Sequence, residues 1–185
     1  MVGRYTKVEF QYPSQEGFIS IIIPVYKDVI GLRETLESIL ESNYPKEKYE
    51  IIIANDGACK EITELCRKYN VHCVSIEPQR GSYYARNVAM KVSRGEWLAF
   101  MDADVIVDKE WLNEIAAHLN EYDYICGYTE INPAMIRTLS HDYEHAVAFK
   151  INPVLPIGPT VNVAFKRNLV SKIGGFDQRL KSGGD

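Results

Sequence analysis

The fold of this chain is decided by the stretch GEWLAFMDAD, residues 95–104. Trp97 to Met101 form a short apolar run after a glycine, and such a run predicts a fully buried β-strand. The run ends in Asp102 and Asp104, and ligands of open α/β sheets bind just beyond the carboxyl ends of the strands. In an extended chain these two carboxylates point to the same side. Their mutual repulsion favours a nearby cation, and oxygen ligands suit Mg²⁺ or Mn²⁺.

The pair of aspartates is not specific by itself. With an ordinary share of aspartate, a chain of this length contains roughly 0.5–1 Asp-x-Asp pattern by chance. The alternative interpretation is an acidic loop in which Asp108 caps the next helix. The position at a strand end, and the motifs elsewhere in the chain, favour a functional site.

Length and composition indicate one ordinary globular domain. The 185 residues are enough to bury a sizeable core, and 46% of them are apolar and 25% charged. The net charge of −4 provides no overall basic field, so no nucleic-acid partner is expected. A substrate that carries phosphates would therefore need a metal ion or a local basic cluster.

Neither a membrane span nor a secretion signal is predicted. No apolar run approaches the roughly 18 residues of a transmembrane helix, and residues 1–17 contain no apolar signal core. We therefore expect a cytoplasmic protein. Four cysteines fit that compartment. The spacing of Cys59, Cys66 and Cys73 is not typical of metal ligands and predicts ordinary buried or half-buried thiols.

Strand and helix patterns alternate along the chain after a lead-in over residues 1–17. Strands are expected at 18–23, ended by Pro24, and at 49–54, 71–76, 97–101, 124–128 and 160–165. Helices are expected at 31–42, 60–69, 82–92 with Ser82 as a cap, 108–119, 134–150 and 168–173. This alternation predicts right-handed βαβ units and a mainly parallel sheet within one domain, residues 18–185.

Three of the predicted strand ends should meet at one edge of that sheet. They carry Pro24-Val25-Tyr26, Asn55-Asp56-Gly57 and Asp102-Ala103-Asp104. A nucleotide needs an aromatic surface for its base, an acceptor for a base N–H, and a counter-charge for its phosphates. Tyr26, Asp56 and the acidic pair with a metal could supply these. The alternatives are a packing role for Tyr26 and a turn before Gly57 for Asp56.

Six motifs, in this order and spacing, resemble family 2 glycosyltransferases of GT-A fold. Together they are highly specific, and they run from the first predicted strand to the end of the chain. They are IIIPVY (21–26), IIIANDG (51–57), RGSYYARN (80–87), GEWLAFMDAD (95–104), NVAF (162–165) and GGFD (174–177). The resemblance implies a Rossmann-like, three-layer α/β/α domain with a mainly parallel central sheet.

The resemblance also implies a nucleotide site. Pro24 and Tyr26 would lie against the nucleotide, with Tyr26 at the base, and Asp56 would accept a hydrogen bond from the base. Asp102 would sit near the ribose and the metal. Arg86 would lie near the nucleotide, where a guanidinium can meet phosphate or fix a carboxylate.

Metal binding and acceptor activation follow from the same resemblance. Asp104, with Asp102, would bind Mn²⁺ or Mg²⁺, and Asp185 would be the base that activates the acceptor hydroxyl. Two positions depart from the family pattern: Asn55 replaces an aspartate, and Gly184 replaces the usual glutamate before the base. Relatives continue beyond the position of Asp185, so we expect the front portion of a longer enzyme, which by itself transfers sugar poorly.

The implied activity is metal-dependent, inverting transfer of a sugar from a nucleotide-diphosphate donor, with UDP favoured. The acceptor would be a hydroxyl of a sugar or lipid-linked sugar, in cell-surface polysaccharide or glycan synthesis. A missing C-terminal part could hold the protein at the inner face of the membrane.

Three alternatives remain open from the residues. Phe100 to Asp104 superficially resembles the nucleophile loop of haloacid-dehalogenase-like phosphatases, although about 100 residues precede it here. A sugar nucleotidyltransferase shares the architecture but needs a glycine-rich loop after its first strand, and residues 24–28 do not form one. The chain could also bind nucleotide without transferring anything.

Overall fold

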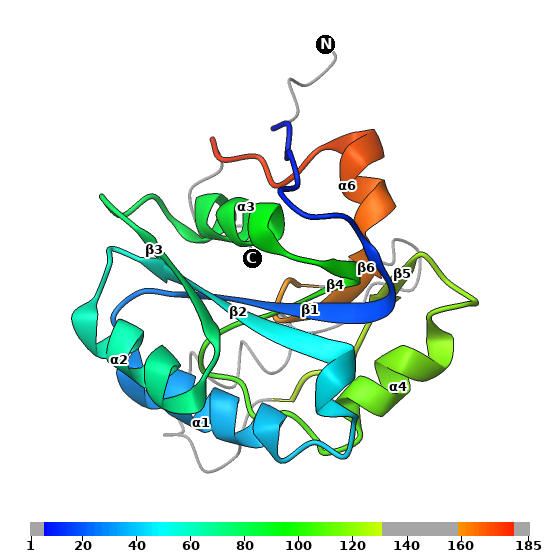
Figure 1. The fold of residues 1–185 in the computed structure, drawn as a ribbon, viewed down its shortest axis with the longest axis horizontal. Helices are drawn as coiled ribbons and strands as arrows, with labels where there is room; N and C mark the ends of the chain where they lie inside the picture. The colour runs from blue at the N-terminus through cyan, green and yellow to red at the C-terminus, as the bar shows by residue number, and fades with distance from the viewer. Residues whose placement is uncertain (1–5, 131–158, 180–185) are drawn as a thin grey trace, which may run out of the picture.

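The computed structural model describes residues 6–130 and 159–179 of the chain. Within these residues a six-stranded sheet lies between two layers of helices (Figure 1). The strands are β1 (Gln15–Val25), β2 (Tyr49–Asp56), β3 (His72–Ile76), β4 (Gly95–Met101), β5 (Tyr124–Cys126) and β6 (Asn162–Lys166). The helices are α1 (Val29–Leu40), the 3₁₀ turn η1 (Lys46–Lys48), α2 (Lys60–Tyr69), α3 (Ser82–Val92), α4 (Trp111–His118) and α6 (Arg167–Ile173).

The sheet is mainly parallel, as the alternation of elements predicts. Its strand order is β3-β2-β1-β4-β6-β5. β1 pairs in parallel with β2 and β4, and β2 pairs in parallel with β3. β6 runs antiparallel to both of its neighbours, β4 and β5. The carboxyl ends of β1, β2 and β4 therefore meet at one edge.

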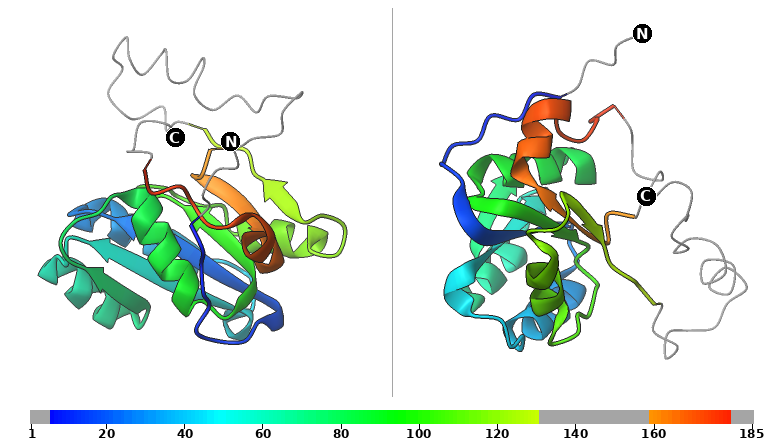
Figure 2. Two further views of the ribbon diagram at one scale, coloured as in Figure 1. Left: turned by 90° about the horizontal axis from the view of Figure 1, so that it is seen from above. Right: turned by 90° about the vertical axis from the view of Figure 1, so that its right-hand side faces the viewer.

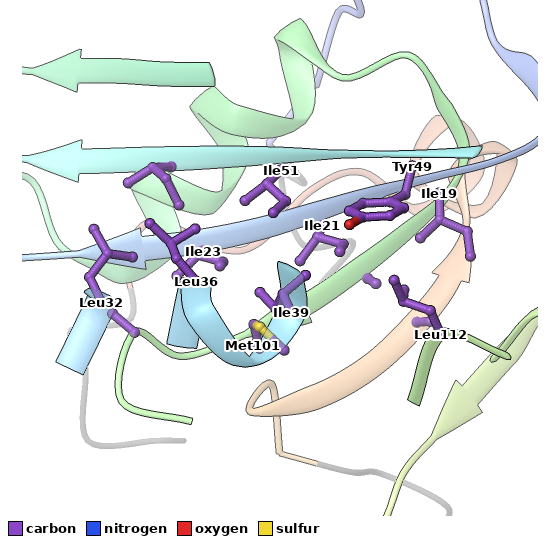
Figure 3. Packing of buried hydrophobic residues seen from close by; sticks show 14 of the residues in the cluster. Ile19, Ile21, Ile23, Leu32, Leu36, Ile39, Tyr49, Ile51, Met101 and Leu112 are labelled. Carbon is purple, nitrogen blue, oxygen red and sulfur yellow. The ribbon is translucent and has the colours of Figure 1, made fainter. Parts of the chain in front are cut away.

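Alternate residues of the central strands supply two separate hydrophobic cores. Ile19, Ile21 and Ile23 of β1 pack under α1, α2 and α4, and Figure 3 shows them facing Leu36 and Ile39. The intervening residues face α3 and α6 on the other side of the sheet, and include Ile22, Ile52, Leu98 and Phe100. The right-hand view of Figure 2 shows these two layers on opposite sides of the sheet. Burial on both faces explains why β1, β2 and β4 are almost continuously apolar.

Most expected elements are present, and α2 and α3 have the predicted bounds. α1 begins earlier than expected, because Asp28 caps it by accepting a hydrogen bond from the Gly31 N–H at 2.9 Å. Ser82 is not the cap of α3; Gly81 holds that position, without a side-chain bond. The helix expected at residues 134–150 lies outside the described residues.

Two expected limits of β1 are wrong. The strand begins at Gln15, inside the expected lead-in, and it continues through Pro24 to Val25. Pro24 is tolerated because it lies beyond Ile22, the last β1 residue paired with β4, and has a partner only in β2. Part of the expected lead-in also belongs to the core, since Val8 is buried in the hydrophobic cluster that includes residues of α3.

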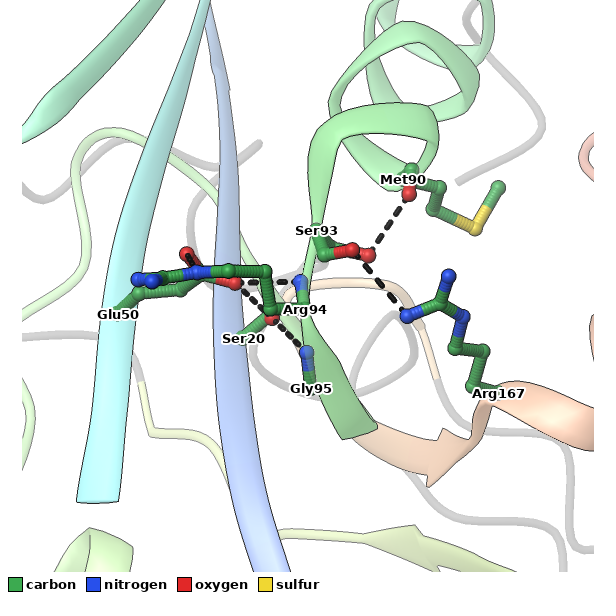
Figure 4. Close-up of polar contacts among 7 residues, drawn as sticks. All are labelled: Ser20, Glu50, Met90, Ser93, Arg94, Gly95 and Arg167. Carbon is green, nitrogen blue, oxygen red and sulfur yellow. Dashed lines mark hydrogen bonds and ion pairs between the residues drawn. The ribbon is translucent and has the colours of Figure 1, made fainter. Parts of the chain in front are cut away.

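Glu50 ties three strands together at the amino edge of the sheet. Its side chain is only 10% exposed and accepts hydrogen bonds from the Ser20 hydroxyl at 2.6 Å and from the Arg94 backbone N–H at 2.7 Å. The Arg94 Nε donates to its second oxygen at 3.0 Å. Ser20 in turn accepts from the Gly95 N–H at 2.8 Å (Figure 4). Glu50 therefore fixes the start of β4, the strand that leads to the acidic pair.

Replacing Glu50 by alanine is expected to lower the free energy of unfolding by about 2–3 kcal/mol, because Ser20 and Arg94 lose a charged acceptor together. Urea denaturation followed by circular dichroism measures the change. Glu47→Ala provides the control, because Glu47 is exposed in η1 and should change stability by less than about 0.5 kcal/mol. Equal stability of the two variants would show that Glu50 does not anchor β4.

None of the helices among the described residues is long and apolar enough to cross a membrane.

Candidate active site

The three predicted strand ends do meet at the carboxyl edge of the sheet. Tyr26 directly follows β1, Asp56 is the last residue of β2, and Asp102 directly follows β4. Because these strands are parallel neighbours, the three residues lie along one edge in the order Asp56, Tyr26, Asp102. The expectation that Asp56 and the acidic pair share an edge is confirmed.

Asp56 is a buried carboxylate that holds the segment after β3. It is 3% exposed, and its Oδ1 and Oδ2 accept hydrogen bonds from the backbone N–H groups of Arg80 and Gly81, each at 2.8 Å. Each carboxylate oxygen can accept more than one hydrogen bond. Asp56 can therefore anchor this segment and still accept from a ligand. The sequence motif identified Asp56 but did not reveal these two donors.

Tyr26 presents an exposed aromatic ring beside the turn that follows Asp56. The residue is 45% exposed, and a Cβ built on Gly57 would lie 3.1 Å from Tyr26 Cε2. Gly57 also has φ +98°, so both its backbone conformation and the adjacent ring favour glycine. Lys27, after β1, and Ala58, after β2, also have a positive φ, which L-residues seldom adopt. Such strain is typical of binding sites.

Arg86 of α3 fixes Asp102. Its Nη2 lies 2.7 Å from Asp102 Oδ1, and its side chain is 1% exposed, whereas that of Asp102 is 36% exposed. The guanidinium carbon lies 5.8 Å and 5.7 Å from the ring centres of Tyr83 and Phe176, within the range of cation–π attraction. Of the two roles considered for Arg86, the structure supports fixing a carboxylate. Direct contact of Arg86 with a nucleotide stays a prediction.

Asn87, the next residue, joins α3 to the segment after α6. Its side-chain amide donates to the Phe176 carbonyl at 2.8 Å, and its oxygen accepts from the Phe176 N–H at 2.9 Å. The Phe176 ring also stacks on Tyr83. The third residue of GGFD thus packs against Arg86, while Asp177 pairs with Arg179, which lowers the pKa of Asp177 to about 2.

The geometry predicted for Asp102 and Asp104 is wrong in one respect. β4 ends at Met101, and Ala103 and Asp104 form a turn, so the side-by-side arrangement of an extended chain does not apply. The turn replaces the strand because β6 pairs with β4 only as far as Met101, opposite Asn162. Asp102 is half-buried and Asp104 is exposed.

Helix α1 positions the acidic turn from the other side. The Val105 N–H donates to the Thr35 hydroxyl at 3.1 Å, and the Val107 N–H donates to the Ser38 hydroxyl at 3.2 Å. A Cβ on Gly31 would lie 2.9 Å from the Ala103 carbonyl oxygen, so this position requires glycine. Sequence patterns gave no sign of these supporting roles, because they depend on contacts between distant parts of the chain.

The acidic turn fits a metal that is shared with a bound diphosphate. Among residues 6–130 and 159–179, no three histidine, cysteine, aspartate or glutamate side chains are grouped closely enough to enclose an ion. Asp102 and Asp104 provide two carboxylates, at least one of them open to solvent. Mg²⁺ and similar hard cations commonly bind through one or two carboxylates, with water and substrate phosphate completing the shell. The chemistry of these donors fits that arrangement.

Two other features lie away from this edge or beyond the described residues. Asp185 and Gly184 are outside the described residues, so the role expected for Asp185 stays a prediction. A hollow of about 700 Å³ lies at the amino edge of the sheet, and its lining includes Tyr12, Tyr69 and Arg94. It contains none of the predicted site residues.

The model of the family described as "Glycosyl transferase family 2" matches residues 20–174, which is most of the chain. The chain belongs to glycosyl transferase family 2. This confirms the resemblance derived from the motifs, and it excludes the haloacid-dehalogenase interpretation of residues 100–104.

Similar proteins are known from sequence and structure. Glycosyltransferase AglE of Haloferax volcanii is 28% identical over 178 residues, covering 91% of this chain and 59% of AglE. Mannosyltransferase PcManGT of Pyrobaculum calidifontis, in complex with GDP-Man and Mn²⁺, is similar in structure, with a TM-score of 0.72 and 19% identity. Staphylococcus aureus TarS in complex with UDP has a TM-score of 0.68 and 22% identity.

These similarities establish the fold, and they show how much of each related chain this protein covers. The match covers 96% of this chain and 52% of the PcManGT chain, and 90% of this chain and 52% of the crystallised chain TarS 1–349. The predicted GT-A architecture is confirmed, and the chain spans 59% of AglE, 52% of the PcManGT chain and 32% of the longer TarS chain.

Proposed function

We propose that this chain forms the donor-binding part of a metal-dependent glycosyltransferase, which transfers a sugar from a nucleotide diphosphate to a hydroxyl with inversion. The observation that carries the proposal is one edge of the sheet where Asp56, Tyr26 and the Arg86-held Asp102 stand in a row. The structure of PcManGT contains GDP-Man and Mn²⁺, and that of TarS contains UDP. Both support a nucleotide-sugar donor.

Asp56 and Tyr26 would bind the base. The exposed Tyr26 ring offers a stacking surface, and Asp56 retains lone pairs for a base N–H. Uracil carries such an N–H, as other bases do, and the resemblance of the motifs to the family favours UDP as the nucleotide.

The acidic turn would bind the ribose and the metal. Arg86 holds one oxygen of Asp102 and leaves the more exposed Asp104 for the cation. When bound, Mn²⁺ or Mg²⁺ would supply positive charge opposite the departing diphosphate. Thr35 and Ser38 would keep the turn in place by binding the backbone that follows it.

Asp185 would take the proton of the acceptor hydroxyl as that oxygen attacks the face of C1 opposite the diphosphate. The support for this role is the position of Asp185 after the GGFD and GG motifs, where relatives of the family carry their base. The attack would pass through a transition state of oxocarbenium character. The hydroxyl would belong to a sugar or lipid-linked sugar of a cell-surface glycan.

Isothermal titration calorimetry with UDP, GDP and ADP, with and without Mn²⁺, tests the proposal. We expect UDP to bind most tightly and only with the metal. In a thermal-shift measurement, UDP at 100 times its dissociation constant should raise the free energy of unfolding by about 2.7 kcal/mol. Binding of none of the three would contradict the nucleotide site. Binding without release of UDP from UDP-sugars, in a longer chain that includes the acceptor-binding segment, would favour a nucleotide-binding role without transfer.

A further inference from the structure

The segment after α6 is fixed from two sides, although it lies beyond the part of the chain that the family model matches. From α3, the Asn87 side chain binds both the N–H and the carbonyl of Phe176, at 2.9 Å and 2.8 Å. From the N-terminal side, the Thr6 carbonyl accepts a hydrogen bond from the Gly175 N–H at 2.8 Å. A Cβ on Gly175 would also overlap with Val8 Cγ2, so the two backbones are in close contact. Figure 1 shows this segment, in red, beside α3.

This backbone grip sets the Phe176 ring into a group of aromatic side chains next to Arg86. The ring stacks on Tyr83 with the ring centres 5.6 Å apart and 4° between the planes. It also meets the Phe100 ring of β4 edge to face, at 5.3 Å between centres. The guanidinium carbon of Arg86 lies almost equally far from the Tyr83 and Phe176 ring centres, at 5.8 Å and 5.7 Å. Phe176 is therefore one wall of the space that the guanidinium occupies.

The wall matters because Arg86 carries the charge that holds Asp102. The Arg86 side chain is 1% exposed, and its Nη2 lies 2.7 Å from Asp102 Oδ1. An ion pair becomes stronger as water is excluded from it, and cation–π attraction also increases with desolvation. Removing the Phe176 ring would admit water to the guanidinium and weaken both interactions. The Asp102 carboxylate would then be held less firmly.

We propose that Phe176 is a positioning residue for donor binding, and that it acts by keeping the Arg86 guanidinium on Asp102. Asn87 is the second positioning residue, because it fixes the backbone from which the ring projects. The effect on nucleotide and metal rests on the proposed function, whereas the shielding of Arg86 does not. Partners that orient a metal-binding carboxylate typically affect metal affinity by 10–100-fold, so we expect about tenfold for a residue one contact further away.

Phe176→Leu removes the ring and keeps an apolar side chain. Calorimetry should show UDP affinity in the presence of Mn²⁺ lowered by about tenfold. The preference for UDP over ADP should remain, because Asp56 lies on another strand. Phe176→Tyr retains the ring and should bind UDP as the wild type does.

Phe165→Leu is the matched control for the loss of a core ring. Phe165 stacks on the same Phe100 ring, with the centres 4.9 Å apart, and belongs to β6 rather than to the segment after α6. This variant should lose stability in urea denaturation without losing UDP affinity. An equal loss of affinity in the Phe165→Leu and Phe176→Leu variants would overturn the proposal, because it would indicate general loosening of the core.

A double-mutant cycle tests whether Phe176 acts through Asp102. In an Asp102→Asn background, Phe176→Leu should weaken UDP binding by less than about twofold, because the contact on which it acts has already been changed. The titrations extend to millimolar UDP so that weak binding is measured. Asn87→Ala should show the same dependence on the background. Full and equal effects of Phe176→Leu in both backgrounds would show that Phe176 acts independently of Asp102.

Hydrogen exchange of the Arg86 side chain, followed by ¹⁵N NMR without nucleotide or metal, tests the shielding directly. The Arg86 side-chain N–H groups should exchange at least about tenfold faster in Phe176→Leu than in wild type, because local opening to water becomes easier. Phe165→Leu should leave their exchange unchanged. If the wild type binds no nucleotide, the proposed function fails, and the exchange rates still decide whether Phe176 shields Arg86. If the wild type binds UDP with Mn²⁺ and Phe176→Leu binds it equally well, Phe176 has no positioning role.

Discussion

In the Asp104→Asn variant, Mn²⁺ is expected no longer to strengthen nucleotide binding, and sugar transfer is expected to be reduced by roughly 10²–10³-fold. The change removes a negative charge from an exposed carboxylate in the turn after β4, without changing its size. Changes outside the first coordination shell already cost 10–100-fold in metal affinity, so loss of a direct ligand should cost at least as much. Loss of one group that offsets charge in a transition state typically costs the stated factor in rate.

Calorimetry with UDP, with and without Mn²⁺, measures the binding effect, and UDP release from a UDP-sugar in the longer chain measures the rate. Asp108→Asn is the matched control, because Asp108 is also an acidic residue after β4 and uses Oδ1 to accept from the Glu110 N–H at 2.8 Å. Asparagine keeps that acceptor, so the control should behave as wild type. Asp104 has no metal role if wild-type protein binds UDP equally well without Mn²⁺.

Asp56→Asn is expected to lower the free energy of unfolding by about 1–3 kcal/mol and to weaken the preference for UDP over ADP by tenfold or more. The two carboxylate oxygens of Asp56 accept from the N–H groups of Arg80 and Gly81 separately. An asparagine side chain can accept at only one of these positions and places its own N–H₂ against the other donor. One buried N–H is then left without an acceptor, which accounts for the stability cost.

Urea denaturation and paired titrations with UDP and ADP measure the two effects of this variant. Asp28→Asn is the control. Asp28 also lies at the carboxyl edge, but it accepts a single backbone hydrogen bond as the cap of α1, a position that asparagine fills equally well. If Asp56→Asn is destabilised but keeps its preference for UDP, Asp56 is only an anchor for the segment after β3, and the base is recognised elsewhere.

The sequence by itself determined the order of elements and the edge at which the candidate site lies. Buried strands such as β2 and β4 are apolar runs of limited length, and helices such as α2 show one apolar face, so both leave a local pattern. Short connections between alternating elements force a parallel sheet, which places Tyr26, Asp56 and Asp102 at one edge. Motif spacing added the family.

Only the tertiary structure decided which groups hold the site residues in place. Arg86 and Asp102 are 16 positions apart, Asp56 and Gly81 are 25 apart, and Thr35 and Val105 are 70 apart. Such partners leave no local periodicity, because they are brought together by packing across the sheet. The same holds for the antiparallel pairing of β6 with β4. This pairing ends at Met101, and the chain then forms a turn at Ala103 and Asp104. Local patterns reflect burial along one element, whereas the geometry of a site depends on how several elements pack against each other.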